Sequence, residues 1–209
     1  MMLKNAYWYF QSALDNTFCD QVIEHANSKK DTIAVTGKFG KKKKLSKEDK
    51  EAVKKVQTQR NSNVVWLNDK WIYDRIVPFI HIANENAGWN FETDWCESIQ
   101  FTKYKLNQFY DWHCDPMDVP YKSPNPNFNG KIRKLSATVQ LSSPDDYKGG
   151  EFELQPRMRT TANYKINVKE IKPRGSVLVF PSHLWHRVKP VTKGVRYSLV
   201  IWNLGYPFK

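Results

Sequence analysis

The stretch Phe180–Arg196, FPSHLWHRVKPVTKGVR, contains the turns and polar residues that decide the fold. It continues an apolar strand that begins at Val177, and Pro181 ends that strand with a turn. Gly194 supplies a second turn before Arg196 opens another apolar run. The stretch therefore predicts two buried strands whose connection carries His186, ten residues before Arg196.

Short strands of this kind recur throughout the chain after Gly88. They are rich in β-branched and aromatic residues and alternate with Pro, Gly, Asn and Asp turns, a pattern typical of a sandwich or barrel. The expected strands are 97–105, 134–142, 151–155, 176–180 and 195–202.

The part before Gly88 predicts mainly helices. A helix follows Asp15-Asn16-Thr17, which offers N-cap chemistry, and a second apolar stripe at helical spacing covers Trp71–Glu85 despite Pro78. A strand is expected at Val64–Leu67 and a short helix at 46–56. We therefore expect an α+β fold, in which N-terminal helices pack on one sheet of a jelly-roll core (a double-stranded β-helix). One domain would cover 1–209, mainly helical over 1–90 and jelly roll over 91–209.

Composition narrows the function classes. The chain has 209 residues, three cysteines and a formal net charge of +12, much of it in the lysine-rich stretch 41–55. That stretch is expected to be solvated surface, so the charge alone is a weak argument for nucleic acid. The cysteines are too scattered for a disulfide framework. The start of the chain resembles no signal peptide and no run is long enough to span a membrane, so we expect a cytoplasmic protein.

His113 and Asp115 are the first candidate site residues. Side chains at i and i+2 of a strand point to the same face, so both can project into a barrel interior. One imidazole and one carboxylate are two corners of the 2-His-1-carboxylate triad that suits Fe(II). The pattern His-x-Asp also occurs by chance, and only the distal segment with His186 makes this interpretation specific.

Together these motifs resemble the prolyl 4-hydroxylase-like branch of the 2-oxoglutarate- and Fe(II)-dependent oxygenases, which includes the bacterial PKHD-type enzymes. The family motif is His-x-Asp, a distal His, and a basic residue about ten positions later. Three more segments resemble the family: Arg60–Leu67, Gln100–Tyr110 and Leu135–Phe152. The resemblance thus extends along most of the chain, apart from the lysine-rich stretch.

The resemblance implies a metal site made by His113, Asp115 and His186, with O2 and 2-oxoglutarate as cosubstrates and ascorbate as a further ligand. Arg196 would pair with the far carboxylate of 2-oxoglutarate, since its planar guanidinium suits bidentate pairing in a dry pocket. Additional cosubstrate contacts are expected from Tyr104, Gln140 and Thr138, the last two on a strand face shared with Ser136.

The substrate pocket is expected to involve further residues near the triad. His183 competes with His186 as the distal ligand, but the family spacing favours His186 and leaves His183 at the rim. Asn107 replaces a glycine common in relatives, and Asn tolerates a left-handed backbone. Substrate choice is expected in the segments 37–55 and 117–133. The candidate pocket residues are Tyr110, Trp202, Ser198, Val188 and His183.

The resemblance implies a hydroxylase acting on a C–H bond, with a prolyl residue of a peptide or protein as the expected substrate. A free amino acid or another small molecule stays open as the substrate. Oxidative demethylation of nucleic acid is a weaker alternative, because those relatives carry a second Arg where this chain has Trp202. A binding module that has lost catalysis is the non-enzyme alternative, which an intact triad and Arg196 disfavour.

Overall fold

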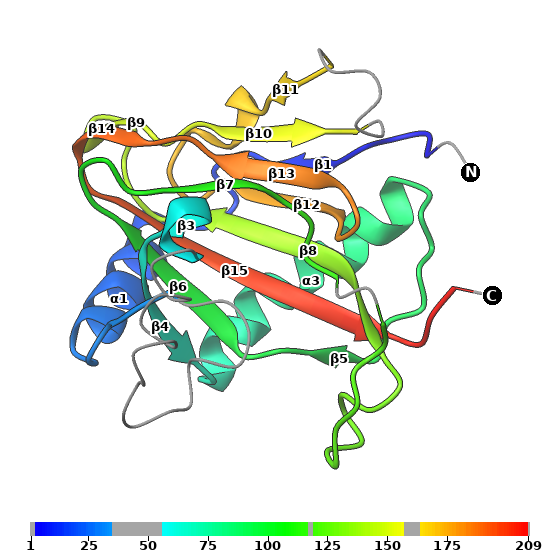
Figure 1. Cartoon of the computed structure of the whole chain (residues 1–209). Helices are drawn as coiled ribbons and strands as arrows, with labels where there is room; N and C mark the ends of the chain where they lie inside the picture. Colours follow the sequence, from blue (N-terminus) through cyan, green and yellow to red (C-terminus); the bar gives the residue numbers. More distant parts are fainter. Residues whose placement is uncertain (1–2, 35–55, 117–118, 157–163, 209) are drawn as a thin grey trace.

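A computed structural model describes residues 3–34, 56–116, 119–156 and 164–208 (Figure 1). Within them two sheets face one another. The larger sheet has eight strands in the order β1-β12-β8-β15-β6-β4-β2, with β5 paired to β15. Its strands are β1 (Trp8–Phe10), β2 (Thr32–Ile33), β4 (Asn63–Leu67), β5 (Trp95–Cys96), β6 (Ile99–Tyr104), β8 (Ile132–Gln140), β12 (Val177–Pro181) and β15 (Arg196–Gly205).

The smaller sheet has five strands in the order β11-β10-β13-β7-β3, and a two-stranded ribbon joins β14 to β9. Among the described residues the strand pairs of these sheets are antiparallel, as the turn-rich sequence predicts. The strands are β3 (Arg60–Asn61), β7 (Phe109–His113), β9 (Tyr147–Gly149), β10 (Phe152–Gln155), β11 (Ile166–Asn167), β13 (Trp185–Val188) and β14 (Val191–Gly194).

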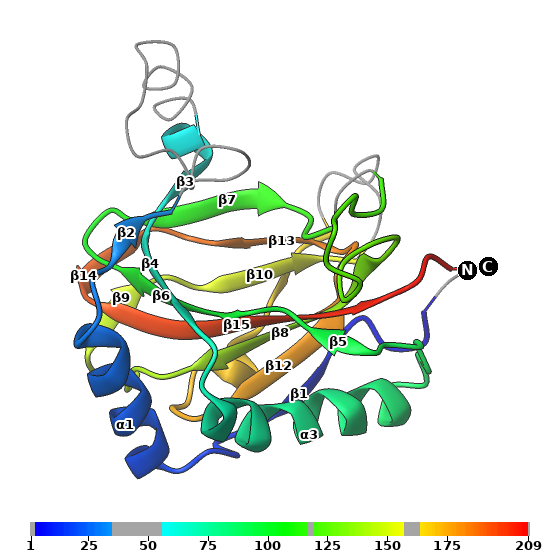
Figure 2. The same ribbon diagram turned by 90° about the horizontal axis from the view of Figure 1, so that it is seen from below.

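Two helices cover the outer face of the larger sheet, as Figure 2 shows. Helix α1 (Asn16–Asn27) begins where the Asp15 carboxylate accepts a hydrogen bond from the Phe18 amide at 2.8 Å, which confirms the expected cap. Helix α3 (Lys70–Asn86) runs through Pro78, and a short 3-10 turn η2 covers Lys169–Ile171. No helix in the described part of the chain combines the length and apolar character needed to cross a bilayer.

Successive side chains of the larger sheet point to opposite faces, and each face belongs to a different apolar cluster. The outer cluster joins the helices to one sheet face and includes Ala137, Val139, Leu199 and Ile201. The inner cluster lies between the two sheets and includes residues of both, among them Tyr104, Leu154, Phe180 and Val188. Residues that alternate with the outer cluster, such as Ser136 and Ser198, therefore face the space between the sheets.

The expected jelly roll with helices on one sheet is confirmed, with two differences in detail. The strand expected at Val64–Leu67 is confirmed as β4 (Asn63–Leu67), but residues 1–90 also contribute β1, β2 and β3 and are less helical than expected. These strands form through pairing with distant partners, which local patterns do not reveal. The expected helix at 46–56 lies outside the described residues apart from Val56, as does the whole of 37–55.

Candidate metal centre

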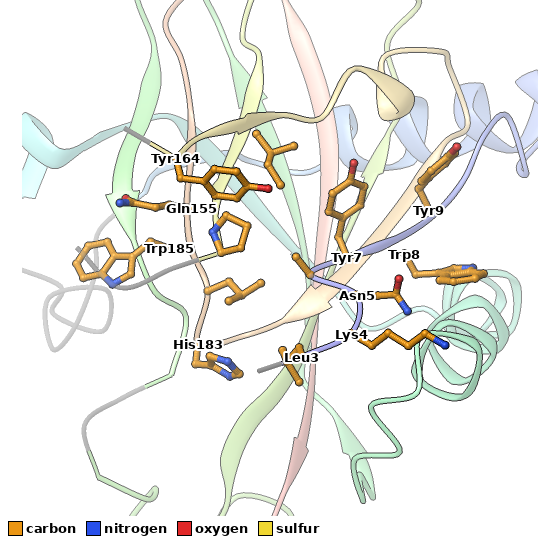
Figure 3. A pocket seen from close by; sticks show the side chains of 14 residues that line it. Leu3, Lys4, Asn5, Tyr7, Trp8, Tyr9, Gln155, Tyr164, His183 and Trp185 are labelled. Atoms are coloured by element: carbon orange, nitrogen blue, oxygen red, sulfur yellow. The ribbon is translucent and has the colours of Figure 1, made fainter. Parts of the chain in front are cut away.

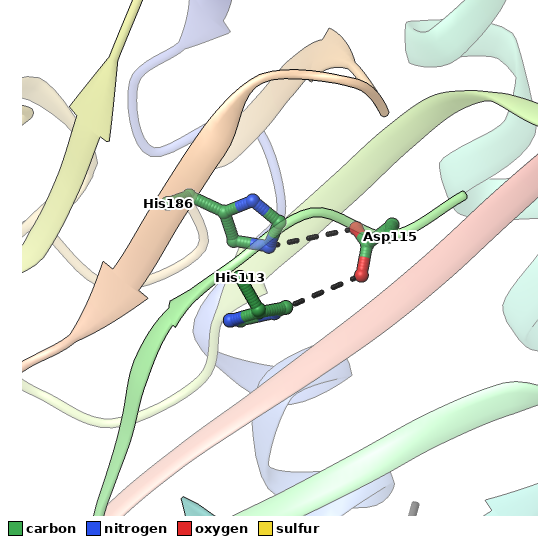
Figure 4. A group of neighbouring side chains, drawn as sticks. All are labelled: His113, Asp115 and His186. Atoms are coloured by element: carbon green, nitrogen blue, oxygen red, sulfur yellow. Dashed lines mark ion pairs between the residues drawn. The ribbon is translucent and has the colours of Figure 1, made fainter. Parts of the chain in front are cut away.

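Three side chains converge between the sheets at the ends of β7 and β13 (Figure 4). His113 ends β7 and is the register partner of His186 in β13, and Asp115 follows two residues after His113. The His113 Nε2 lies 3.8 Å from Asp115 Oδ1, and the His186 Nε2 lies 3.5 Å from Asp115 Oδ2. One ligand atom from each residue lies within 4.8 Å of the others, so the three can hold one metal ion.

Both imidazoles present the same nitrogen to this point. The Nδ1 of His113 lies 2.8 Å from the carbonyl oxygen of Asp111, and the Nδ1 of His186 lies 2.9 Å from that of Leu184. A carbonyl oxygen only accepts, so each Nδ1 carries the proton and donates it. Each Nε2 is then left with a lone pair toward the centre, which is the tautomer that a metal ligand requires.

The charge states of His113 and Asp115 also suit a metal. Burial, and then the neighbouring His186, lower the pKa of His113 to about 3, so its imidazole is neutral at pH 7. Burial alone would raise the pKa of Asp115. The two imidazoles, Arg133 and the Ser136 hydroxyl outweigh burial, and the pKa of Asp115 is lowered. His113 therefore offers a neutral imidazole to a metal, and Asp115 offers a carboxylate.

Tyr110 supports the centre from the side. Its ring stacks on the His113 imidazole with centroids 3.4 Å apart and planes 11° apart. The Arg60 guanidinium carbon lies 4.5 Å from the centroid of the Tyr110 ring. Burial raises the pKa of Tyr110 to about 12, so the phenol stays neutral. Tyr110 thus contacts a triad residue, in keeping with its expected place beside the pocket.

Asp115 has a polar surrounding that no sequence motif indicated. The Ser136 hydroxyl donates to Oδ2 at 2.6 Å, and the Ser182 hydroxyl lies 2.8 Å from that of Ser136. Arg133 lies near the Asp115 carbonyl oxygen and pairs with both oxygens of Glu97 at 2.6 and 2.7 Å. Strand alternation places Ser136 on the inward face, but its partner in the turn after β12 follows from tertiary structure alone.

Arg196 lies between the sheets, in the strand β15 that the sequence predicts. It is 2% exposed, and its register partner is Tyr104. Its guanidinium carbon lies 5.7 Å from the Tyr104 ring, and Nη1 donates to the Ser198 hydroxyl at 3.4 Å. Among the residues that the structure describes, no carboxylate forms an ion pair with Arg196. A buried guanidinium that lacks an ion-pair partner is suited to bind an anionic ligand.

Gln140 is placed on the inward face as expected, but its amide is engaged within the protein. Its Nε2 donates to the Ser142 carbonyl oxygen at 3.0 Å and to the Tyr147 hydroxyl at 3.1 Å. The Tyr147 hydroxyl therefore keeps its own proton for another acceptor. A Cβ added at Gly150 would lie 3.5 Å from the Tyr147 ring and 3.0 Å from Arg196 Cδ, so Tyr147 lies beside Arg196. Tyr147 is a candidate contact that the sequence analysis missed.

The remaining candidates occupy different environments. Thr138 is 5% exposed and pairs in register with Val200 and Leu178, so it lies inside the sheet. Val188 belongs to the inner apolar cluster. Trp202 lies under the Arg133 guanidinium at 3.8 Å and is 5% exposed. By strand alternation Thr138 and Trp202 share the inward face of the larger sheet with Ser136 and Ser198.

His183 does not join the triad. Its side chain is exposed in the turn between β12 and β13, whereas His186 is 5% exposed. His183 lines a separate cavity of about 1130 Å³ (Figure 3). Aromatic side chains from the N-terminal segment and from the strands surround that cavity, among them Tyr7, Tyr164 and Trp185. Asn107 adopts a φ of 63°, so the left-handed backbone expected there is confirmed.

Relatives with curated names match part of the chain. A PKHD-type hydroxylase of Synechococcus sp. is 40% identical over 68 residues, which are 32% of this chain and 27% of the relative. A PKHD-type hydroxylase of Pseudoalteromonas atlantica is 34% identical over 104 residues, which are 49% of this chain and 41% of the relative. The matched segments thus span less than half the length of these relatives.

Solved structures match the fold over nearly the whole chain. A viral collagen prolyl hydroxylase from Paramecium Bursaria Chlorella virus-1, in complex with 2OG, covers 97% of both chains with a TM-score of 0.64 and 19% identity. A Pseudomonas putida prolyl-4-hydroxylase covers 96% of this chain and 93% of its own, with a TM-score of 0.64 and 16% identity. A prolyl hydroxylase of Trichoplax adhaerens, in complex with a peptide fragment, covers 96% and 84% with a TM-score of 0.62 and 17% identity.

The family model of the 2OG-Fe(II) oxygenase superfamily matches residues 99–203. This match runs from the start of β6 to near the end of β15, so it includes both imidazoles, Asp115 and Arg196. It covers half of the 209-residue chain. The chain belongs to the 2OG-Fe(II) oxygenase superfamily.

Proposed function

We propose that this chain is an Fe(II)- and 2-oxoglutarate-dependent dioxygenase that hydroxylates a C–H bond. The observation that carries the proposal is the convergence of His113 Nε2, His186 Nε2 and an Asp115 carboxylate oxygen within 4.8 Å. Bound Fe(II) would supply the oxidising chemistry that couples decarboxylation of 2-oxoglutarate by O2 to hydroxylation of the substrate. Three protein ligands hold such a metal without filling its coordination sphere.

The protein's own contribution is to bind and orient the cosubstrate. Arg196 would hold the far carboxylate of 2-oxoglutarate, since its buried guanidinium has no ion-pair partner among the described residues. Tyr104 would shape the same end of the pocket as the cross-strand neighbour of Arg196. Thr138 and Gln140 would line this end, and Tyr147 would donate its free hydroxyl proton to the carboxylate.

For the substrate we propose a prolyl residue of a peptide or protein. The curated relatives are named PKHD-type hydroxylases, and the structural neighbours are prolyl hydroxylases, one of them in complex with a peptide fragment. A free amino acid or another small molecule is the second candidate. The described cysteines Cys19, Cys96 and Cys114 are free, which fits the reducing cytoplasm that we propose as its location.

Nucleic acid is a weaker candidate despite the net charge of +12. Demethylases of alkylated bases carry a second Arg at the position of Trp202. Here Trp202 is buried under Arg133, and Arg133 is already paired with Glu97. Neither group offers a free cation to a phosphate or a base at that position.

Succinate formation tests the enzyme. Anaerobically purified protein would receive Fe(II), 2-oxoglutarate and ascorbate, and then O2 with a panel of proline-containing peptides, free amino acids or alkylated oligonucleotides. We expect succinate in proportion to a product heavier by one oxygen atom, located by mass spectrometry on a prolyl residue of a peptide. Failure to bind Fe(II), together with no succinate from any substrate, would leave the binding-module alternative. Product from oligonucleotides alone would reject the prolyl substrate.

A further inference from the structure

Two buried serines form a hydrogen-bonded chain that ends on the carboxylate of Asp115. Ser136 lies on β8 and Ser182 follows β12, so both belong to the larger sheet or its end, while Asp115 follows β7 of the smaller sheet. Both serines are 0% exposed. The hydroxyl oxygens lie 2.8 Å apart, and Ser136 Oγ lies 2.6 Å from Asp115 Oδ2. The chain therefore links the two sheets at the metal centre.

The direction of each hydrogen bond follows from the number of protons that each group can donate. A carboxylate oxygen accepts hydrogen bonds, so Ser136 donates its single proton to Asp115 Oδ2. Ser136 then meets Ser182 only as an acceptor, and Ser182 must be the donor. Hydrogen bonds aligned in one direction strengthen one another, and the last of them has a charged acceptor.

The backbone closes this chain into a ring. The Asp115 amide donates to the Ser182 carbonyl oxygen at 3.1 Å, and the Ser182 amide donates to the Lys134 carbonyl oxygen at 2.9 Å. Asp115 is thus held through its main chain by the same residue that orients Ser136. Its remaining freedom is rotation of the side chain, and the hydroxyl of Ser136 restricts that rotation.

We propose that Ser136 and Ser182 are positioning residues that hold Asp115 as a one-oxygen metal ligand. The inference rests on the proposed function, because it concerns the same metal. With Oδ2 occupied by the Ser136 proton, Oδ1 is the oxygen with all its lone pairs available. If Oδ2 also bound the metal, it would take one of the positions that a facial triad leaves open for cosubstrates. Groups that orient metal ligands in this way commonly change metal affinity 10- to 100-fold when removed.

Metal affinity tests the proposal independently of turnover. Co(II) is a suitable probe, since O2 does not consume it during a titration monitored by calorimetry and by its visible absorption. We expect Ser136→Ala to weaken Co(II) binding roughly tenfold. Ser182→Ala should weaken it less, because Ser136 keeps its bond to Oδ2. Ser136→Thr retains the hydroxyl and should bind Co(II) nearly as tightly as the unmodified protein.

Ser176→Ala is the matched control. Ser176 is also 0% exposed, and its hydroxyl accepts a hydrogen bond from the Ser12 amide at 3.0 Å instead of contacting the triad. It should lose thermal stability without losing Co(II) affinity. Equal affinity of the unmodified protein, Ser136→Ala and Ser182→Ala would overturn the positioning role, as would equal losses in Ser136→Ala and Ser136→Thr. Absence of Co(II) and Fe(II) binding in the unmodified protein would instead overturn the proposed function.

Discussion

The imidazole of His113 lies flat against the ring of Tyr110, with centroids 3.4 Å apart and planes 11° apart. This contact fixes the ring plane of His113, while the Asp111 carbonyl oxygen fixes its Nδ1. Both contacts reduce the freedom that a metal would otherwise have to remove on binding. We therefore expect the aromatic ring of Tyr110, and not its hydroxyl, to increase metal affinity.

Tyr110→Ala should weaken Co(II) or Fe(II) binding several-fold, because the imidazole loses its stacking partner and gains rotational freedom. Tyr110→Phe keeps the ring and should bind the metal as the unmodified protein does. Isothermal titration under anaerobic conditions gives both affinities. Equal losses in the two variants would show that the hydroxyl, and not the stacking, supports the centre.

Substitutions of the two histidines in the β12–β13 segment should have different effects on metal binding. His186→Ala removes a ligand donor at the centre and should abolish metal-dependent succinate formation. His183→Ala should leave metal affinity unchanged, because His183 lies in the exposed turn and lines the other cavity. Metal titration and succinate formation measure both variants. Loss of metal binding in His183→Ala with retention in His186→Ala would reverse the assignment.

Arg196→Gln should raise the KM for 2-oxoglutarate by roughly ten- to hundredfold, the typical cost of losing a hydrogen-bonded charge partner. Arg196→Lys keeps the charge but loses the planar guanidinium. Its KM for 2-oxoglutarate should lie between those of the unmodified protein and Arg196→Gln. Steady-state succinate formation at varied 2-oxoglutarate gives the KM. Metal affinity serves as the control and should stay unchanged in both variants, since Arg196 has no contact with the triad.

Local sequence patterns predicted the parts of this site that depend on local geometry. Alternation along β8 put Ser136 and Gln140 on the inward face, and the cap at Asp15 fixed the start of α1. The Arg133–Glu97 pair could not be predicted in this way, because its members are 36 residues apart and meet only through tertiary packing. The same holds for β1 and β3, which form by pairing with distant partners.

Acid should destabilise the metal-free protein through His113. Burial, and then His186, lower the pKa of His113 from 6.5 to about 3. Between these values the unfolded chain binds the proton that the folded chain rejects, so the free energy of unfolding falls as the pH drops below about 6.5. The stabilisation is fully present above the unfolded pKa and is lost as the pH falls toward 3.

Urea unfolding at pH 7 and pH 5 measures this effect. The unmodified protein should lose more stability between the two pH values than His113→Asn, because Asn does not titrate. The difference between the two slopes would be at most about 1.4 kcal/mol per pH unit for one proton. Identical slopes would show that His113 does not carry the acid sensitivity.

Gly150→Ala tests whether the position of Arg196 controls cosubstrate binding. Gly150 has a φ of 64°, and an added Cβ would lie 3.0 Å from Arg196 Cδ and 3.1 Å from Val191 Cγ2. The guanidinium stem must therefore shift, and the KM for 2-oxoglutarate should rise several-fold. Gly130→Ala is the matched control, since Gly130 has a φ of 75° and its added Cβ would meet only the Tyr206 ring, at 3.5 Å. Both variants should lose about 1–2 kcal/mol of stability from the left-handed backbone, but only Gly150→Ala should lose affinity for 2-oxoglutarate. An equal rise in KM in the two variants would show that general destabilisation, and not displacement of Arg196, is responsible.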